Sequence, residues 1–162
     1  MREIRRKEKA IEDIDEIKKI IQTAQHITIA MCQDNQPYLV TLSHGYDQES
    51  NIIYFHCASK GKKNDILDTN STIWGQALID MGYKQGACDH LYRTAQFRGK
   101  VSFIVNPEEK RVALTNMINK LDNDPQAVIE KQLTEKSIKR VTIGRIDIDF
   151  ISGKESKKVV FV

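Results

Sequence analysis

Residues 52–67 read Ile-Ile-Tyr-Phe-His-Cys-Ala-Ser-Lys-Gly-Lys-Lys-Asn-Asp-Ile-Leu, and the rest of the chain is interpreted outward from them. The first half is a run of β-branched and aromatic residues, which predicts a mostly buried strand. From Lys62 onward the apolar residues have helical spacing, which predicts a short helix ending near Thr69. The stretch is therefore expected to form a strand, a loop and a helix.

The loop in this stretch combines Gly61 with three lysines, Lys60, Lys62 and Lys63. The first N–H groups of a helix lack intrahelical acceptors and carry partial positive charge, so they attract anions. Glycine allows close backbone approach, and lysine side chains suit a phosphate. Lysines at a helix start oppose the helix dipole unless an anion lies among them. The sequence leaves two interpretations open: a phosphate site or a solvated basic loop.

The composition is that of one soluble domain. The chain has 162 residues, of which 40% are hydrophobic and 29% charged, and its net charge of +3 does not require a nucleic-acid partner. No apolar run approaches the roughly 20 residues that span a bilayer, and the N-terminus lacks the pattern of a secretory signal. Cys32, Cys57 and Cys88 are widely spaced without a CxxC pair. We therefore expect reduced thiols, a cytoplasmic location and no membrane partner.

Apolar periodicity predicts the remaining elements of this single domain, residues 1–162. Connections between the early strands are too short for parallel crossovers, so we expect an antiparallel meander. Strands with helices between and around them predict an α+β fold, most simply a small barrel. The expected elements are a basic arm (1–10), a helix from Asp13 to near Ala24, strands 27–32, 38–44, 52–57, 72–80, 92–105 and 141–151, helices from Pro107 and over 126–136, and an edge strand at 159–162.

Four details of these elements are also predicted. Asn106 and Pro107 give a strong helix start, with a cap followed by proline at the first helical position. Gly99 is expected to bend the long strand around it. Two segments are expected to be irregular, the turn 45–51 and the loop 81–89. The buried face of the helix from Pro107 is predicted to consist of Val112, Ala113, Met117, Ile118 and Leu121.

The motifs of several enzyme classes are absent from the sequence: GxGxxG, the P-loop, GxSxG and HExxH. His56 and Cys57 are adjacent in a strand and point to opposite faces, which argues against a thiol nucleophile. Cys88 and His90 are closer in sequence than zinc ligands usually are, so no metal site is expected. The basic arm is interleaved with glutamates, and a solvated arm is favoured over a nucleic-acid contact.

Polar and aromatic residues of the neighbouring strands extend the candidate site beyond the lysine loop. Together they suit a flat heteroaromatic ligand with a phosphate tail, although each is also an ordinary strand residue. They are Thr41, Ser43, Tyr54, His56, Tyr92, Arg93, Thr94 and Gln96.

Several stretches, in order along nearly the whole chain, resemble the FMN-binding split-barrel superfamily of pyridoxamine 5'-phosphate oxidase-like proteins. Within that superfamily the chain is most similar to the nitroimidazole-resistance type. The stretches that carry the resemblance are residues 1–7, 36–47, 54–58, 61–63, 88–89 with 92–94, Gly99, 106–110, and 145–149 with 152–154.

The resemblance implies a six-stranded antiparallel split barrel with peripheral helices, working as a homodimer with FMN in a cleft between the subunits. It implies that Gly61, Lys62 and Lys63 surround the FMN phosphate and that His56 lies at the start of the phosphate and ribityl site. The backbone of Val40, Thr41 and Leu42 would follow the isoalloxazine edge. The residues implied to approach from the neighbouring strand, in the same or the other subunit, are Tyr92, Arg93, Thr94 and Gln96.

The function implied by the resemblance is an FMN-dependent oxidoreductase. It would pass electrons from a nicotinamide donor, bound transiently over the flavin, to a small oxidised acceptor such as a nitroaromatic, with His56 as the candidate proton donor. Lys62 stands where the family often has arginine, and the substrate-phosphate residues of pyridoxamine-phosphate oxidases are missing near the C-terminus. The alternatives are a non-enzymatic flavin or haem carrier or sensor, a deazaflavin-dependent reductase, and a nucleic-acid-associated protein that uses the basic arm.

Overall fold

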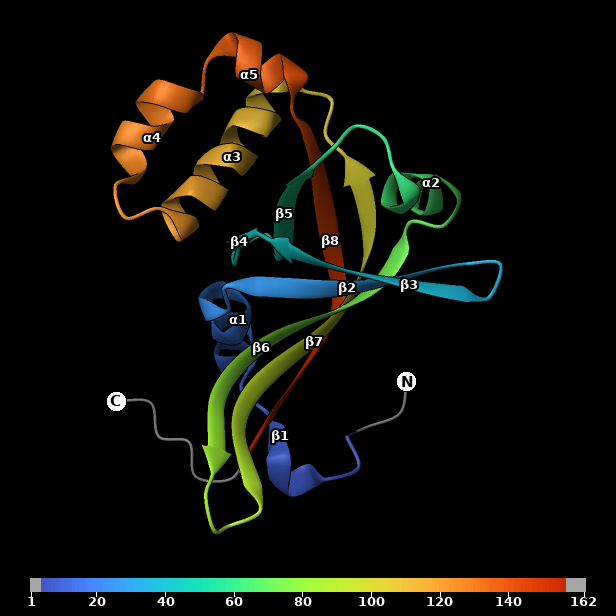
Figure 1. The fold of residues 1–162 in the computed structure, drawn as a ribbon, viewed down its shortest axis with the longest axis vertical. Coiled ribbons are helices and arrows are strands. Elements are labelled where there is room, and N and C mark those ends of the chain that lie inside the picture. The colour runs from blue at the N-terminus through green and yellow to red at the C-terminus, as the bar shows by residue number, and fades with distance from the viewer. Residues whose placement is uncertain (1–3, 157–162) are drawn as a thin grey trace.

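The computed structural model describes residues 4–156 as one antiparallel sheet with helices around it (Figure 1). Its strands are β1 (Ala10–Ile11), β2 (His26–Gln33), β3 (Gln36–Ser43), β4 (Gly45–Asp47), β5 (Ile52–Cys57), β6 (Thr72–Lys84), β7 (Asp89–Phe103) and β8 (Thr142–Glu155). Its helices are the 3-10 turn η1 (Lys7–Lys9), α1 (Ile14–Thr23), α2 (Lys62–Thr69), α3 (Pro107–Leu121), α4 (Pro125–Gln132) and α5 (Glu135–Arg140). The predicted α+β class is confirmed, with eight strands in the described sheet instead of six.

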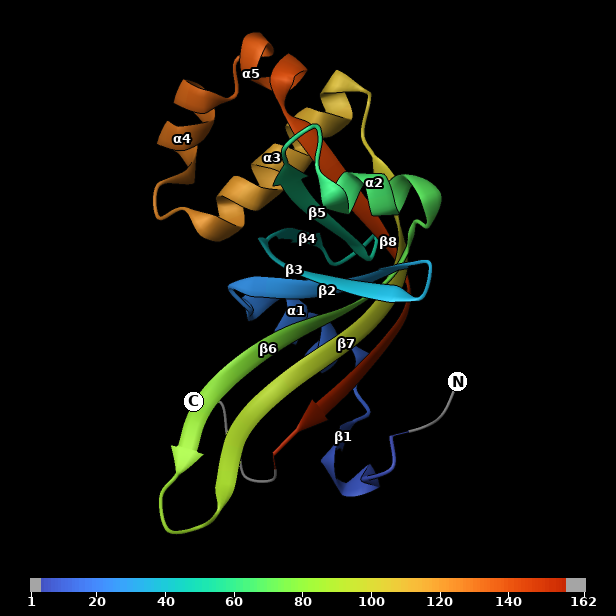
Figure 2. The same cartoon turned by 45° about the vertical axis from the view of Figure 1, so that its right-hand side comes forward.

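The strands follow the order β3-β2-β6-β7-β8-β5-β4, and β1 adds to β8. The first and last strands of this path are consecutive in the chain and are joined by His44 alone. The sheet must therefore curl until its two ends meet, although β3 forms no ladder with β4. In both views α3, α4 and α5 gather at one end, and the β6–β7 hairpin extends from the other (Figures 1 and 2).

Three predictions about the strands were wrong. The early strands do not form one meander, because β3 pairs with β2 whereas β5 pairs with β4 and β8. Residues 45–47, predicted as part of a turn, form β4. Most of the predicted loop 81–89 is strand, with the hairpin tip limited to the four residues between Lys84 and Asp89. Its glycines suggested irregularity, but Gly82 accompanies a bulge inside β6.

The C-terminal half also differs in part from the expectation. The helix predicted over 126–136 is broken, because Thr134 caps a new helix, α5, by accepting from Ser137 N at 3.2 Å. In α3, Asn106 caps the start as predicted, and the register shift at Gly99 is present. β8 continues to Glu155, past the predicted end at 151. The predicted edge strand at 159–162 and the first three residues of the arm lie outside the described residues.

The buried face predicted for α3 was too wide. Ala113 and Met117 are buried, but Val112 is 60% exposed and Leu121 44% exposed. The helix covers only one face of β5 and β4, so a narrow apolar stripe is enough to bury it. Val112 and Leu121 therefore remain on the solvent side of α3.

The core has two parts that meet at β5. Ile53 and Phe55 face the main core, which includes the buried side of α1. Ile52 and Tyr54 face a second cluster with Ala113 and Met117 of α3. A strand covered on both faces has no polar side, which explains the continuous apolar run in the sequence.

Two glycines let aromatic rings lie flat across neighbouring strands. Gly144 of β8 pairs with Phe55, and a Cβ there would lie 2.1 Å from the Phe55 ring. Gly75 of β6 pairs with Phe97 in the same way, at 2.2 Å. Both rings are fully buried. Each glycine thus makes room for one of the two largest core side chains.

We expect Gly144→Ala to lower the free energy of unfolding by about 1–3 kcal/mol, because the added methyl group overpacks the ring of Phe55. Chemical denaturation of the parent and the variant measures the difference. Ser102→Ala, an exposed β7 position, is the control and should change little. Combining Gly144→Ala with Phe55→Leu should cost less than the sum of the single changes. Strict additivity would contradict this explanation.

His44, the residue that joins β3 to β4, is fully buried and hydrogen-bonded. Its Nε2 lies 2.9 Å from Ile21 O of α1 and 2.7 Å from Lys120 Nζ of α3. Lys120 Nζ also donates to Ala24 O at 2.8 Å. Burial, and next the charge of Lys120, lower the pKa of His44 to about 4. The joint of the barrel is therefore held by a neutral imidazole between two helix ends.

The stability of the protein should fall as the pH drops from 6.5 to 4. The unfolded chain binds a proton at His44 with an ordinary pKa of 6.5, whereas the folded chain binds it only near 4. Acid thus favours unfolding, by up to about 3 kcal/mol from this group. Denaturation at both pH values measures the slope. His44→Asn should flatten it. Equal slopes in the parent and the variant would refute this assignment.

Candidate functional site

The loop before α2 forms an uncapped helix N-terminus. Gly61 is the N-cap residue with a φ of 142°, a conformation that favours glycine, and no side chain caps the helix. Asn64 N and Asp65 N both donate to Gly61 O, at 2.8 and 3.1 Å. The N–H groups of Lys62 and Lys63, at the first two helical positions, have no acceptor within the helix. They are free to bind an anion.

Asn64 fixes the shape of this loop. It is 7% exposed, and its Nδ2 donates to Ala58 O at 3.0 Å. Its Oδ1 accepts from the Cys57 thiol at 4.0 Å. Sequence reasoning did not select this residue. The available signal was an asparagine in the first turn of a helix, where its side chain commonly bonds to nearby backbone.

The three lysines of the loop are available to a ligand. Lys62 Nζ lies 4.6 Å from the centroid of the Tyr38 ring, and Lys63 Nζ lies 4.9 Å from that of Phe55. Lys60 is exposed. Within residues 4–156 none of the three forms an ion pair with a carboxylate. The loop therefore has a net positive charge that the described protein does not neutralise.

β3 lies beside this loop and has one unpaired edge. Tyr38, the ring under Lys62, belongs to β3. β3 is at the end of the sheet path and pairs with β2, so its outward backbone groups are free. Val40 and Leu42 pack against the main core, whereas Thr41 is exposed with its hydroxyl 3.0 Å from that of Thr28. The structure thus brings the predicted residues of β3 and of the loop to one side of the barrel.

His56 is the penultimate residue of β5, the strand that leads into the loop, but its side chain lies on the face of β5 opposite Lys63. Phe55, which contacts Lys63, faces the main core, so the alternating His56 faces the side of Tyr54 and the second cluster. The His56 side chain is exposed and forms no hydrogen bond with any described residue. Its imidazole is accessible from outside.

The four predicted residues of β7 lie far across the sheet from the loop, since β2 and β6 separate β7 from β3. Arg93 is buried and pairs with Glu16 at 3.0 Å and Glu155 at 2.9 Å. The Thr94 hydroxyl donates to a backbone carbonyl of β6, and Tyr92 lies under the Lys9 amine. Arg93 and Thr94 therefore stabilise the chain locally.

Gln96 differs from these three because it is exposed on the outer face of the sheet. We define this outer face by two rows of residues in register across β3, β2, β6, β7 and β8. One row is polar: Thr41, Thr28, Gln76, Gln96 and Ser152. The next is Leu39, Ala30, Trp74, Arg98 and Phe150.

Large apolar side chains are exposed on this outer face. Leu39 is 62%, Trp74 41% and Leu78 48% exposed. Such side chains grouped on one surface usually mark an interaction site. Sequence reasoning missed them, although the apolar–polar alternation of 72–80 placed Trp74 and Leu78 on the face opposite the core.

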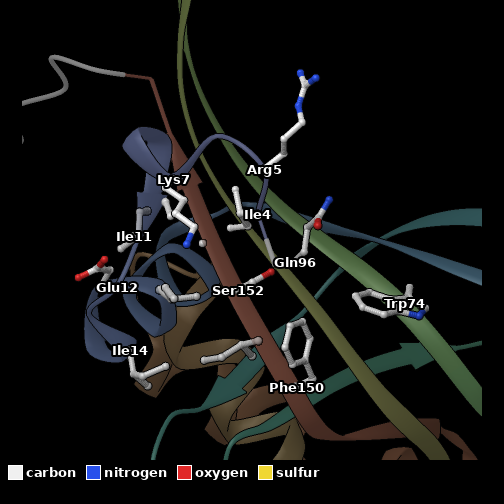
Figure 3. Close-up of a pocket in the computed structure, with 14 residues that line it drawn as sticks. Ile4, Arg5, Lys7, Ile11, Glu12, Ile14, Trp74, Gln96, Phe150 and Ser152 are labelled. Atoms are coloured by element: carbon white, nitrogen blue, oxygen red, sulfur yellow. The ribbon is translucent and has the colours of Figure 1, made fainter. Parts of the chain in front are cut away.

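The N-terminal arm forms a cleft with the outer face, which we term the arm cleft (Figure 3). Its volume is about 910 Å³. β1 attaches the arm to β8 through the pairs Ala10 with Lys154 and Ile11 with Gly153. The residues on which its chemistry depends are Arg5, Trp74, Gln96, Phe150 and Ser152.

Residues 4–156 contain no group of three His, Cys, Asp or Glu side chains that could hold a metal ion. No helix of that range is long and apolar enough to cross a membrane.

Known structures of similar fold include flavin and haem proteins. A candidate 5-nitroimidazole antibiotic resistance protein from Bacteroides thetaiotaomicron is 26% identical, with 90% of this chain and 86% of that chain covered and a TM-score of 0.76. Flavocytochrome Anf3 from Azotobacter vinelandii is 16% identical, with coverages of 96% and 73% and a TM-score of 0.77. The FAD and haem binding protein from Mycobacterium smegmatis is 16% identical, with coverages of 95% and 76% and a TM-score of 0.76.

Sequence comparison assigns the family. No curated protein matches the chain. The family model for pyridoxamine 5'-phosphate oxidase matches residues 13–155, which include every strand from β2 to β8. The resemblance noted from the sequence is thereby confirmed, and the chain belongs to the pyridoxamine 5'-phosphate oxidase family.

Proposed function

We propose that the protein is an FMN-dependent oxidoreductase that holds the FMN phosphate on the loop before α2. The observation that carries this proposal is the uncapped N-terminus of α2 with the unneutralised charges of Lys60, Lys62 and Lys63. Free backbone N–H groups and cations together are the donor set that a phosphate needs. The residues present therefore fit the phosphate of the group.

The flavin ring would lie along the free edge of β3. The backbone of Val40, Thr41 and Leu42 offers hydrogen-bond donors and acceptors there, because β3 pairs with β2 and its other edge is open. Tyr38 connects this edge to the loop through its contact with Lys62. The cofactor supplies the redox chemistry when bound, and the chain binds and orients it.

A second copy of the chain would complete the site. Gln96 cannot reach the loop of its own chain across β2 and β6, yet it is exposed on the outer face with Trp74 and Leu78. Two outer faces packed together would bury Leu39 and Leu78 and place Gln96 of one copy near β3 of the other. This arrangement supports a homodimer with FMN at the interface.

The substrates proposed for this site are a nicotinamide electron donor and a small oxidised acceptor such as a nitroaromatic. Both would bind transiently. Because the His56 imidazole is exposed and forms no hydrogen bond with the described chain, it is available to hold or release a proton. It is the proposed proton donor, facing the side of β5 opposite Lys63.

The purified protein should be yellow and release FMN, and Lys63→Ala should weaken FMN binding about tenfold by removing a charge-assisted contact to the phosphate. Visible absorption and titration of the flavin-free protein measure both. Lys84→Ala, at the end of the β6–β7 hairpin, is the matched control and should bind as the parent does. Release of haem or of a deazaflavin, or failure to take up FMN, would overturn the proposal.

Leu78→Glu should weaken the dimer more than about tenfold, because it buries an unpaired carboxylate between two apolar faces. Val112→Glu, an equally exposed apolar position on α3, should leave the dimer intact. Sedimentation equilibrium measures both constants. A monomeric parent, or dissociation by Val112→Glu alone, would contradict the proposed interface.

A further inference from the structure

The arm cleft has an aromatic floor. Trp74 and Phe150 contact each other edge to face, with ring centroids 5.8 Å apart and planes at 65°. Trp74 is 41% exposed, and its neighbour on β2 is the small Ala30. An indole with an open face beside a second ring is a surface on which another planar ring can stack.

Polar groups without partners lie on the same cleft. Neither the Gln96 amide nor the Ser152 hydroxyl forms a hydrogen bond with the described chain. A smaller hollow of about 220 Å³ shares Ile4, Gln96 and Ser152 with the arm cleft and extends it to Lys154. A few free polar groups on a mainly apolar surface are typical of small-molecule sites.

Two cations at the cleft are not balanced by carboxylates of the described chain. Arg5 and Lys154 form no ion pair within residues 4–156. The carboxylate that lines the cleft, Glu12, lies at the end away from Trp74, next to Ile14 (Figure 3). Arg6, the neighbour of Arg5, does not line the cleft and pairs with Glu8 at 2.8 Å. Lys7 and Glu12 thus lie together on the side of the cleft away from Trp74, whereas Arg5 lies on the side of Gln96 (Figure 3).

We propose that the arm cleft binds a planar aromatic anion. Its ring stacks on Trp74 beside Phe150, its polar ring substituents meet Gln96 and Ser152, and its negative group lies between Arg5 and Lys154. The volume of about 910 Å³ is ample for one such molecule.

This site goes beyond the flavin loop, because no residue of that loop or of β3 lines the cleft. In one respect it rests on the proposed function: if a second copy covers the outer face, the cleft opens toward the partner's flavin, and its occupant is the electron acceptor. Binding itself requires no flavin, so it can be tested separately.

Trp74 is the only tryptophan of the chain, and its fluorescence therefore reports on the cleft directly. Titration of the flavin-free protein with 4-nitrobenzoate should give saturable quenching, corrected against free N-acetyltryptophanamide. The uncharged 4-nitrobenzamide should bind at least about threefold more weakly, because it lacks the charge contact. Linear quenching equal to that of the free indole would overturn the proposal.

Two neighbouring arginines supply the matched variants. Arg5→Ala should weaken 4-nitrobenzoate binding about threefold, and Arg5→Ala with Lys154→Ala about tenfold. Arg6→Ala should bind as the parent does. Equal effects of Arg5→Ala and Arg6→Ala, or equal affinity for the acid and the amide, would refute anion recognition by the cleft.

Flavin distinguishes this site from the proposed cofactor site. With FMN bound, as read from its visible absorption, 4-nitrobenzoate should still quench Trp74 saturably. Direct competition between FMN and 4-nitrobenzoate would overturn the proposal, because the cleft would then belong to the flavin. If the protein bound no flavin, the proposed function would be wrong, but the titration of Trp74 fluorescence with 4-nitrobenzoate would be unaffected.

Discussion

The architecture depends on a one-residue joint. β3 ends at Ser43 and β4 begins at Gly45, so the two ends of a long strand path are forced together at His44. A buried imidazole without partners would be costly, and here Nε2 donates to Ile21 O of α1 while Nδ1 accepts from Lys120 Nζ of α3 at 3.3 Å. Because the joint closes the barrel without a ladder between β3 and β4, the outer edge of β3 stays open. The same constraint that closes the core thus leaves backbone groups free beside the lysine loop.

Local patterns predicted the parts of the fold that are set by local chemistry. The cap at Asn106, the helix start at Asp13 and the strand–loop–helix of residues 52–69 follow from side chains a few positions apart. Pairing partners are set over longer distances. Nothing in the short stretch 45–47 shows that it pairs with β5 while β3 turns to β2, because that choice depends on how the whole sheet curls. Glycines lie both at true bends and inside strands, so the length of the β6–β7 hairpin was underestimated.

The charged part of the candidate site could be predicted from the sequence. The part that depends on which side chains are buried in the fold could not. Three lysines around a glycine at a helix start indicate an anion whatever the tertiary fold. On β7, Arg93 and Gln96 seemed equivalent as site residues. The structure separates them, because Glu16 and Glu155 enclose the arginine whereas Gln96 lies on the outer face. The exposure of Trp74 was not predicted for the same reason, because it depends on neighbouring strands that come together only in the folded sheet.

The two faces of the sheet differ in how they are covered. α1 covers the inner side of β6, β7 and β8, and the glycines at 75 and 144 let that side take two buried aromatic rings. The other side of the same strands carries Trp74 and Leu78 in solvent, with the arm attached only at its margin by β1. The apolar side chains exposed on the other face add little to the packing of the chain itself. Exposed apolar patches of this kind promote association. This outer face is thus the surface on which the proposed second copy would pack, with the proposed planar ligand beneath the arm.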